Sequence, residues 1–127
     1  MYEQYIIHTK PENIVKSGVV TGFQVGSKAP YYRGLGISMV EDILVTVDGK
    51  QVSPENIRVV LHGNTYTLKE METEPDDRWE FGEVGTIKVM QPGGLAPGEH
   101  TIDIVFNLRI SYMPINAVRK GSKTFTV

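Results

Sequence analysis

Several features that would point to a function class are missing from this sequence. None of its 127 residues is cysteine, which excludes a disulfide scaffold and any Cys-ligated zinc or iron–sulfur site. Lys and Arg number 13 against 15 Asp and Glu, a net charge of −2, so the basic surface typical of nucleic-acid binding is lacking. No apolar run approaches the ~20 residues of a membrane span. The first residues carry no secretory signal. We therefore expect a cytoplasmic protein with neither a nucleic-acid nor a membrane partner.

Helical patterning is also scarce. No window of 11 or more residues keeps a 3.6-residue period, and the one helical turn we expect is 53–56, with Ser53 as cap and Pro54 in the first position. The 13 glycines and 7 prolines instead separate short β-branched or aromatic runs about every ten residues. This pattern predicts an all-β protein, an antiparallel two-sheet β-sandwich of about 7–9 strands with little helix. One domain over residues 1–127 is expected. Area scaling predicts about 6,800 Å² of folded surface, which leaves a sizeable core.

The clearest predicted strand runs from His100 to Tyr112. Its even-numbered residues share one phase and should face the core, whereas the odd-numbered ones should face solvent or a partner. Val105 is the one aliphatic residue on the polar phase. At ~3.3 Å per residue the run would be about 40 Å long, which predicts a bend or a change of sheet midway.

Other strands follow the same alternation. Asp48-Gly49 predicts a tight hairpin turn after one strand, because such a turn needs positive φ angles. Gly63-Asn64 predicts a second hairpin. The remaining predicted strands cover residues 2–8, 19–25, 43–47, 57–61, 65–68, 84–90 and 122–127.

The first candidate functional segment is 29–36. It holds Tyr31, Tyr32 and Arg33, and two phenols beside a guanidinium suit a partner protein or a sugar ring. An equally weighted interpretation is that one tyrosine anchors the loop in the core while Arg33 pairs with a carboxylate.

The second candidate segment is 76–82. It contains Arg78, Glu80 and the only tryptophan, Trp79, and Trp and Arg are enriched at binding hot spots. The adjacent carboxylates of Asp76 and Asp77 are too few for a calcium loop. The alternative, which we favour slightly, is a buried Trp79 that starts a strand after a solvated acidic turn.

The third segment, 91–100, is rich in glycine but lacks the spacing and the following helix of a phosphate cradle. His100 falls on the core phase and is expected to be a hydrogen-bonded core residue. No nucleophile triad, glycosidase-type carboxylate pair or metal-ligand set stands out. From the residues alone we therefore predict no catalytic or metal-binding residue on this chain, and a binding or accessory module.

The order of these motifs resembles one known family. The motifs are Pro30-Tyr31-Tyr32-Arg33-Gly34, Val47-Asp48-Gly49, Arg78-Trp79-Glu80-Phe81-Gly82, Pro92-Gly93-Gly94-Leu95, Pro97-Gly98-Glu99-His100 and Arg109-Ile110-Ser111-Tyr112. Together they are similar to the β (small) subunit of bacterial C-glycoside deglycosidases, over about residues 18–114.

The resemblance implies a partner and a reaction. Such lyase complexes cleave the carbon–carbon bond between a sugar and an aromatic aglycone, as in flavonoid C-glycosides, by elimination from the 3-keto form of the glycoside. The α subunit of such a complex is expected to be a TIM barrel with a divalent metal, Mn²⁺ by expectation, and the acid–base groups. The β-sandwich would support that barrel in a hetero-oligomer without being catalytic alone or holding a cofactor itself. Tyr31, Tyr32, Arg33, Arg78, Trp79 and Glu80 would then lie at the partner interface or border the active site.

Two other readings stay open at this point. A stand-alone carbohydrate-binding β-sandwich would bind sugar through an exposed aromatic platform. A self-sufficient lyase or isomerase would be active without a partner and would hold a metal.

Overall fold

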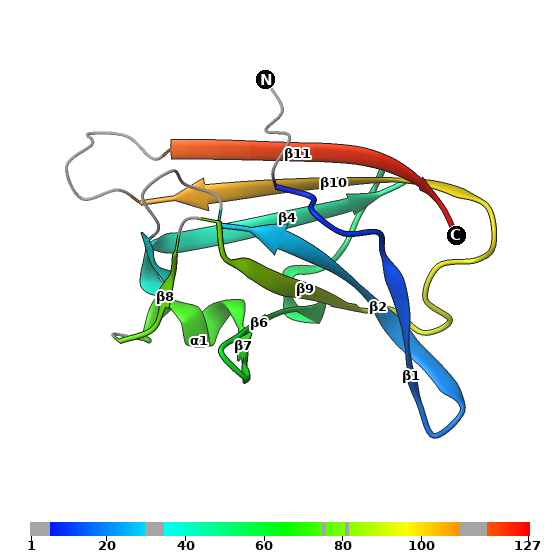
Figure 1. Cartoon of the computed structure of the whole chain (residues 1–127), viewed down its shortest axis with the longest axis horizontal. Helices are drawn as coiled ribbons and strands as arrows, with labels where there is room; N and C mark the ends of the chain where they lie inside the picture. The colour runs from blue at the N-terminus through cyan, green and yellow to red at the C-terminus, as the bar shows by residue number, and fades with distance from the viewer. Residues whose placement is uncertain (1–5, 30–34, 75, 81, 110–116) are drawn as a thin grey trace.

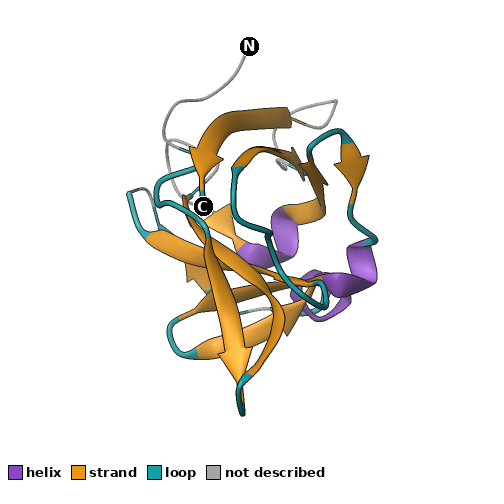
Figure 2. Cartoon of the chain, turned by 90° about the vertical axis from the view of Figure 1, so that its right-hand side faces the viewer, coloured by secondary structure: helices purple, strands orange, loops and turns teal. Residues whose placement is uncertain are grey.

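The computed structural model describes residues 6–29, 35–74, 76–80, 82–109 and 117–127. Strands make up most of this part of the chain, and the helical segments are short (Figure 2). Two antiparallel sheets lie face to face, as predicted for a β-sandwich (Figure 1). The exposed surface is 7067 Å², close to the value expected from chain length. No helix in the described ranges is long and apolar enough to cross a membrane.

The first sheet has five strands in the order β1-β2-β9-β6-β7. Their bounds are Glu12–Lys16 (β1), Val19–Lys28 (β2), Val84–Met90 (β9), Ile57–Leu61 (β6) and Asn64–Thr67 (β7). β2 and β9 pair along seven residues, from Gly22 opposite Met90 to Lys28 opposite Val84. This pairing forms the centre of the sheet.

The second sheet has four strands in the order β11-β10-β4-β5. Their bounds are Ala117–Thr126 (β11), Glu99–Leu108 (β10), Val40–Val47 (β4) and Lys50–Gln51 (β5). β10 lies between β4 and β11 and pairs with both. The expected change of sheet is not observed, because β10 stays in this sheet through Leu108. Residues 110–112 of the predicted strand lie outside the described residues.

Short elements close one end of the sandwich, on the left in Figure 1. Leu35–Gly36 (β3) pairs with Arg78–Trp79 (β8), and the helix Leu68–Glu72 (α1) lies beside them. Sequence periodicity missed α1 because five residues are too few to show a period. Thr67 caps it in a capping box with Glu70, a local signal that identifies a helix start. The predicted turn near Ser53 is a 3-10 turn at Pro54–Asn56.

The core lies between the sheets and follows the predicted alternation. Ile102, Ile104, Phe106 and Leu108 on β10 are fully buried. Facing positions on the other strands are buried as well, among them Phe23, Val25, Ile43, Val45, Ile57, Val59, Ile87 and Val89. His100, predicted for the core phase, lies at the end of this row with 15% of its side chain exposed.

The two chain ends differ most from the sequence prediction. β1 was not predicted, and within the predicted strand 2–8 Ile7 forms an isolated bridge to Ser27, while residues 1–5 lie outside the described residues. The last strand begins at Ala117, five residues earlier than predicted. Ile6 packs so closely on Gly121 that a Cβ there would lie 2.8 Å from the Ile6 side chain. The first described residues therefore pack against β11.

Trp79 fills the closed end of the core. It is fully buried, and its ring meets Phe106 edge-on, with centroids 5.8 Å apart. The indole N–H donates to the Glu83 carbonyl over 2.8 Å. A Cβ added to Gly85 would lie 2.9 Å from the Trp79 ring and 3.0 Å from Leu61. Only glycine therefore leaves room for the indole at this position.

Replacing Gly85 with alanine should destabilise the fold by about 1–3 kcal/mol, because the added methyl forces the buried ring to move. Urea unfolding of the full chain measures this change. Gly36→Ala is the matched control: its φ is −67° and the nearest atom to an added Cβ lies 4.0 Å away. The control should change stability by less than about 0.5 kcal/mol. Equal stability of the two variants would contradict the packing described.

Candidate functional site

The sequence-predicted residues divide into three groups in the structure. Tyr31, Tyr32 and Arg33 lie outside the described residues. Arg78 and Glu80 are exposed, and they form an ion pair in which Arg78 Nε donates to Glu80 Oε1 over 2.8 Å. Trp79 between them points into the core, which agrees with the reading of a buried tryptophan that starts a strand.

The described residues that flank the first predicted segment lie beside the second one. Ala29, just before residues 30–34, donates its backbone N–H to the Glu83 carbonyl over 3.1 Å. Leu35, just after them, pairs with Trp79. The two described flanks of the Tyr-Tyr-Arg segment, Ala29 and Leu35, are therefore bonded to the segment that follows Arg78.

A histidine network that the sequence did not reveal fastens this end. His62 Nδ1 lies 2.7 Å from Asp77 Oδ1, and His62 Nε2 lies 2.6 Å from Glu83 Oε2. Tyr66 Oη donates to Asp77 Oδ2 over 2.6 Å. The network joins the β6–β7 turn, the approach to β8 and the loop before β9.

His62 occupies an unusual backbone position. Its φ is +52°, and Gly63 follows at +79°. The hairpin turn is therefore His62-Gly63 rather than the predicted Gly63-Asn64. Left-handed geometry disfavours most side chains, although His tolerates it better than branched residues. The two carboxylate contacts stabilise a histidine where a glycine or an asparagine would be easier to accommodate.

Both ring nitrogens of His62 face carboxylates, which only accept hydrogen bonds. Both contacts can be hydrogen bonds only if each nitrogen carries a proton, that is, if the ring is an imidazolium. The contact with Asp77, followed by that with Glu83, raises the pKa of His62. The Tyr66 hydroxyl, followed by His62, lowers the pKa of Asp77. The same hydrogen bond to Asp77 raises the pKa of Tyr66 to about 12, so Tyr66 is a constant donor at neutral pH.

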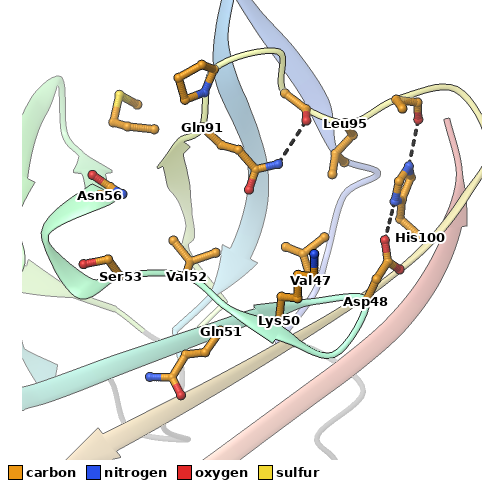
Figure 3. Close-up of a pocket in the computed structure, with 14 residues that line it drawn as sticks. Val47, Asp48, Lys50, Gln51, Val52, Ser53, Asn56, Gln91, Leu95 and His100 are labelled. Carbon is orange, nitrogen blue, oxygen red and sulfur yellow. Dashed lines mark hydrogen bonds and ion pairs between the residues drawn. The ribbon is translucent and has the colours of Figure 1, made fainter.

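A hollow lies at the opposite end of the sandwich, between the β4–β5 turn and the loop after β9 (Figure 3). Its volume is about 560 Å³. His100 lines one side of it. Its Nδ1 lies 2.6 Å from Asp48 Oδ2, and its Nε2 lies 2.7 Å from the Ala96 carbonyl oxygen. These contacts raise the pKa of His100, with Asp48 as the larger cause.

Within the described parts of the chain, no three His, Asp or Glu side chains gather so that they could hold a metal ion. His62 and His100 each have both ring nitrogens engaged. The hydrogen bonds of His62 and those of His100 therefore connect loops to each other.

Comparison with known proteins decides the family. The sequence profile described as "C-glycoside deglycosidase beta subunit" matches residues 1–112. The chain belongs to this family. β11, Ala117–Thr126, lies beyond the matched residues.

Individual relatives agree with the family assignment. A C-glycoside deglycosidase beta subunit from Eubacterium cellulosolvens is 37% identical over 98 residues, which are 77% of this chain and 67% of the relative. A 3'-dehydrocarminate deglycosidase beta subunit from a Microbacterium species is 32% identical, over 69% of this chain and 66% of its own length. A C-glycoside deglycosidase beta subunit from Arthrobacter globiformis is 28% identical, over 77% of this chain and 75% of its own length. The chain thus spans about two thirds of the length of the first two relatives.

The His62 network gives this family member a testable pH dependence. Because the folded-state pKa of His62 is raised, its stabilising effect is complete below the unfolded value of about 6.5. The effect is lost as the pH rises through the folded pKa. We expect the stability difference between the wild-type chain and His62→Asn to shrink from pH 6 toward pH 9. Asparagine is chosen because it tolerates positive φ, and urea unfolding at each pH gives the difference.

His8→Asn, at an exposed position, controls for the loss of a histidine. Since His100 is present in both the wild-type chain and the His62 variant, its own titration cancels in the difference. An NMR titration midpoint for the His62 ring at or below about 6.5 would contradict the network.

Proposed function

We propose that this chain is the small β subunit of a C-glycoside deglycosidase complex. Membership of the beta subunit family is the observation that carries this proposal. The partner would be an α subunit, a TIM barrel. The complex would act as a lyase, cleaving the carbon–carbon bond between sugar and aglycone in 3-keto C-glycosides, including flavonoid C-glycosides, by elimination.

In this proposal the divalent metal, Mn²⁺ by preference, lies on the α subunit together with the acid–base residues. When bound there, the metal would polarise the ketone of the sugar and favour removal of the neighbouring proton. The β chain contributes surface and rigidity instead, and it is not catalytic alone.

The end of the sandwich that bears β8 is the surface we assign to the α subunit. Arg78 and Glu80 project outward there because Trp79 between them is fixed in the core. An arginine held at the rim of an interface suits recognition of carboxylates, since its fork donates two parallel hydrogen bonds. Tyr31, Tyr32 and Arg33 would extend this surface, because Ala29 and Leu35 on either side of them are bound to the 79–83 segment.

The His62 network supports this assignment by its position. It holds the Asp77 and Glu83 ends of the segment that presents Arg78 and Glu80. A surface whose backbone is already fixed loses less conformational entropy when it binds a partner. The partner surface would therefore be preorganised by the charge contacts at its two ends.

The interface assignment predicts that removal of the exposed Arg78–Glu80 ion pair weakens binding to the α subunit. Arg78→Ala with Glu80→Ala should weaken binding to the α subunit about tenfold or more, which corresponds to roughly 1.4 kcal/mol. The free chain should keep its melting temperature, because exposed ion pairs contribute little stability. Isothermal titration of the α subunit with each variant measures binding.

The matched control is Glu12→Ala with Lys16→Ala, an exposed pair of opposite charges on β1. It should bind the α subunit as the wild-type chain does. Equal affinity of all three proteins would show that the β8 end is not the interface.

The proposed roles of the two subunits predict which chains are needed for activity. Turnover of a 3-keto C-glycoside should require both chains, and the β chain alone should show none. The assay follows release of the aglycone by the β chain, the α chain and their mixture. Aglycone release by the β chain alone would favour the self-sufficient lyase instead.

A further inference from the structure

We propose that the hollow at the end opposite β8 binds a small uncharged molecule with a hydroxylated ring. This proposal goes beyond the role as a β subunit and does not depend on it. A sugar ring and a phenolic ring share the required chemistry: two uncharged ring faces, and hydroxyl groups at the edge.

The hollow has the size and composition of a small-molecule site. Its volume is about 560 Å³, within the range of roughly 300–1,000 Å³ for ligand pockets. The apolar part of the lining comes from both walls and consists of Val47, Val52, Met90, Pro92, Leu95 and Ala96. In Figure 3, Val47 and Val52 point up from the β4–β5 side toward Gln91 and Leu95 on the loop opposite. A ring between these walls would bury both of its faces.

The polar groups of the hollow both donate and accept hydrogen bonds. Gln91 donates through Nε2 to the Gly94 carbonyl, which fixes the carboxamide and leaves its oxygen as an acceptor directed into the hollow (Figure 3). Asn56 offers a second carboxamide at the rim, and Lys50 offers a donor. Hydroxyl groups are themselves donors and acceptors, so a mixed set of this kind matches them.

The charges of the lining explain why an uncharged ligand is favoured. The Asp48 carboxylate is neutralised by His100, whose ring needs both protons to reach Asp48 and the Ala96 carbonyl. Asp48 also accepts from the Thr101 backbone N–H, and its pKa is lowered by that bond and by His100. Lys50 is exposed at the mouth, where water screens its charge. The paired Asp48 and His100 therefore give the inside of the hollow no net charge that would select an anion or a cation.

The loop wall is preformed. Asn13 makes two bonds to Leu95, donating from Nδ2 to its carbonyl over 3.0 Å and accepting from its N–H over 2.8 Å. Gly94 has a φ of +58°, and an added Cβ would lie 2.4 Å from the Asn13 side chain. The His100 bridge then joins this wall to the β4–β5 turn. A site held on both sides loses little entropy when a ligand binds.

The test is a ¹⁵N-NMR titration of the full chain with three probes: D-glucose, phloroglucinol and, as a charged ring, benzoate. We expect glucose or phloroglucinol to shift the amide signals of the non-proline residues within 47–56 and 90–96, with a dissociation constant on the order of 1 mM. Shifts with glucose alone identify a sugar site, and shifts with phloroglucinol alone identify a phenol site. Tighter binding of benzoate than of either neutral ring would overturn the assignment.

Asn56→Ala should weaken the neutral probe about two- to tenfold, the effect of losing one hydrogen bond. The matched control, Asn64→Ala on β7 at the opposite end of the sandwich, should leave that affinity unchanged. The inference fails if neither neutral probe shifts these signals at about 50 mM, or if both asparagine variants bind alike. Neither failure affects the α-subunit test at Arg78 and Glu80.

Discussion

The closed end of this sandwich depends on the burial of one side chain. Trp79 takes its place beside Phe106 and donates to the Glu83 carbonyl, so a loop rich in charge is tied to the hydrophobic core. Alternation along a strand then places Arg78 and Glu80 outward. The same ring excludes any residue but glycine at position 85. The surface that we assign to the partner therefore depends on a residue that does not itself reach it.

Histidines whose two ring nitrogens both face acceptors join the loops at both ends of the molecule. At one end His62 lies between two carboxylates, and at the other His100 lies between a carboxylate and a carbonyl. In each case both partners accept only, so the cationic ring suits the site better than the neutral one. Loops far apart in sequence are thereby joined without cysteine, in a chain that has none. The contacts of both histidines are favoured at neutral or mildly acidic pH rather than at alkaline pH, because they need the protonated ring.

The sequence predicted the parts of the fold that depend on local pattern. Strict alternation identified β10 and its buried row, and Asp48-Gly49 gave the correct turn because both residues need positive φ. The His62 network could not be predicted, since its members are 15 and 21 residues apart and meet only after β6, β8 and β9 are in place. The sequence favours a buried Trp79 only slightly, because its charged neighbours are compatible with an outward as well as an inward indole, and the structure confirms the buried position. The sequence does not predict β1, because four of its five residues are exposed and one is half-buried. Such a strand has no buried face and therefore no alternation of apolar and polar residues.

The two ends of the sandwich should act independently. β10 links them, with His100 at the hollow and Phe106 against Trp79, six residues or about 20 Å apart. Coupling over that distance needs an element with two alternative arrangements. β10 is paired on both sides through Ile102–Leu108, so a shift of this strand would break hydrogen bonds to both neighbours. The changes in free energy caused by substitutions or ligands at such separated sites add, with little interaction between them. A ring bound in the hollow would therefore add a binding function to the subunit without altering how the β8 end meets its partner.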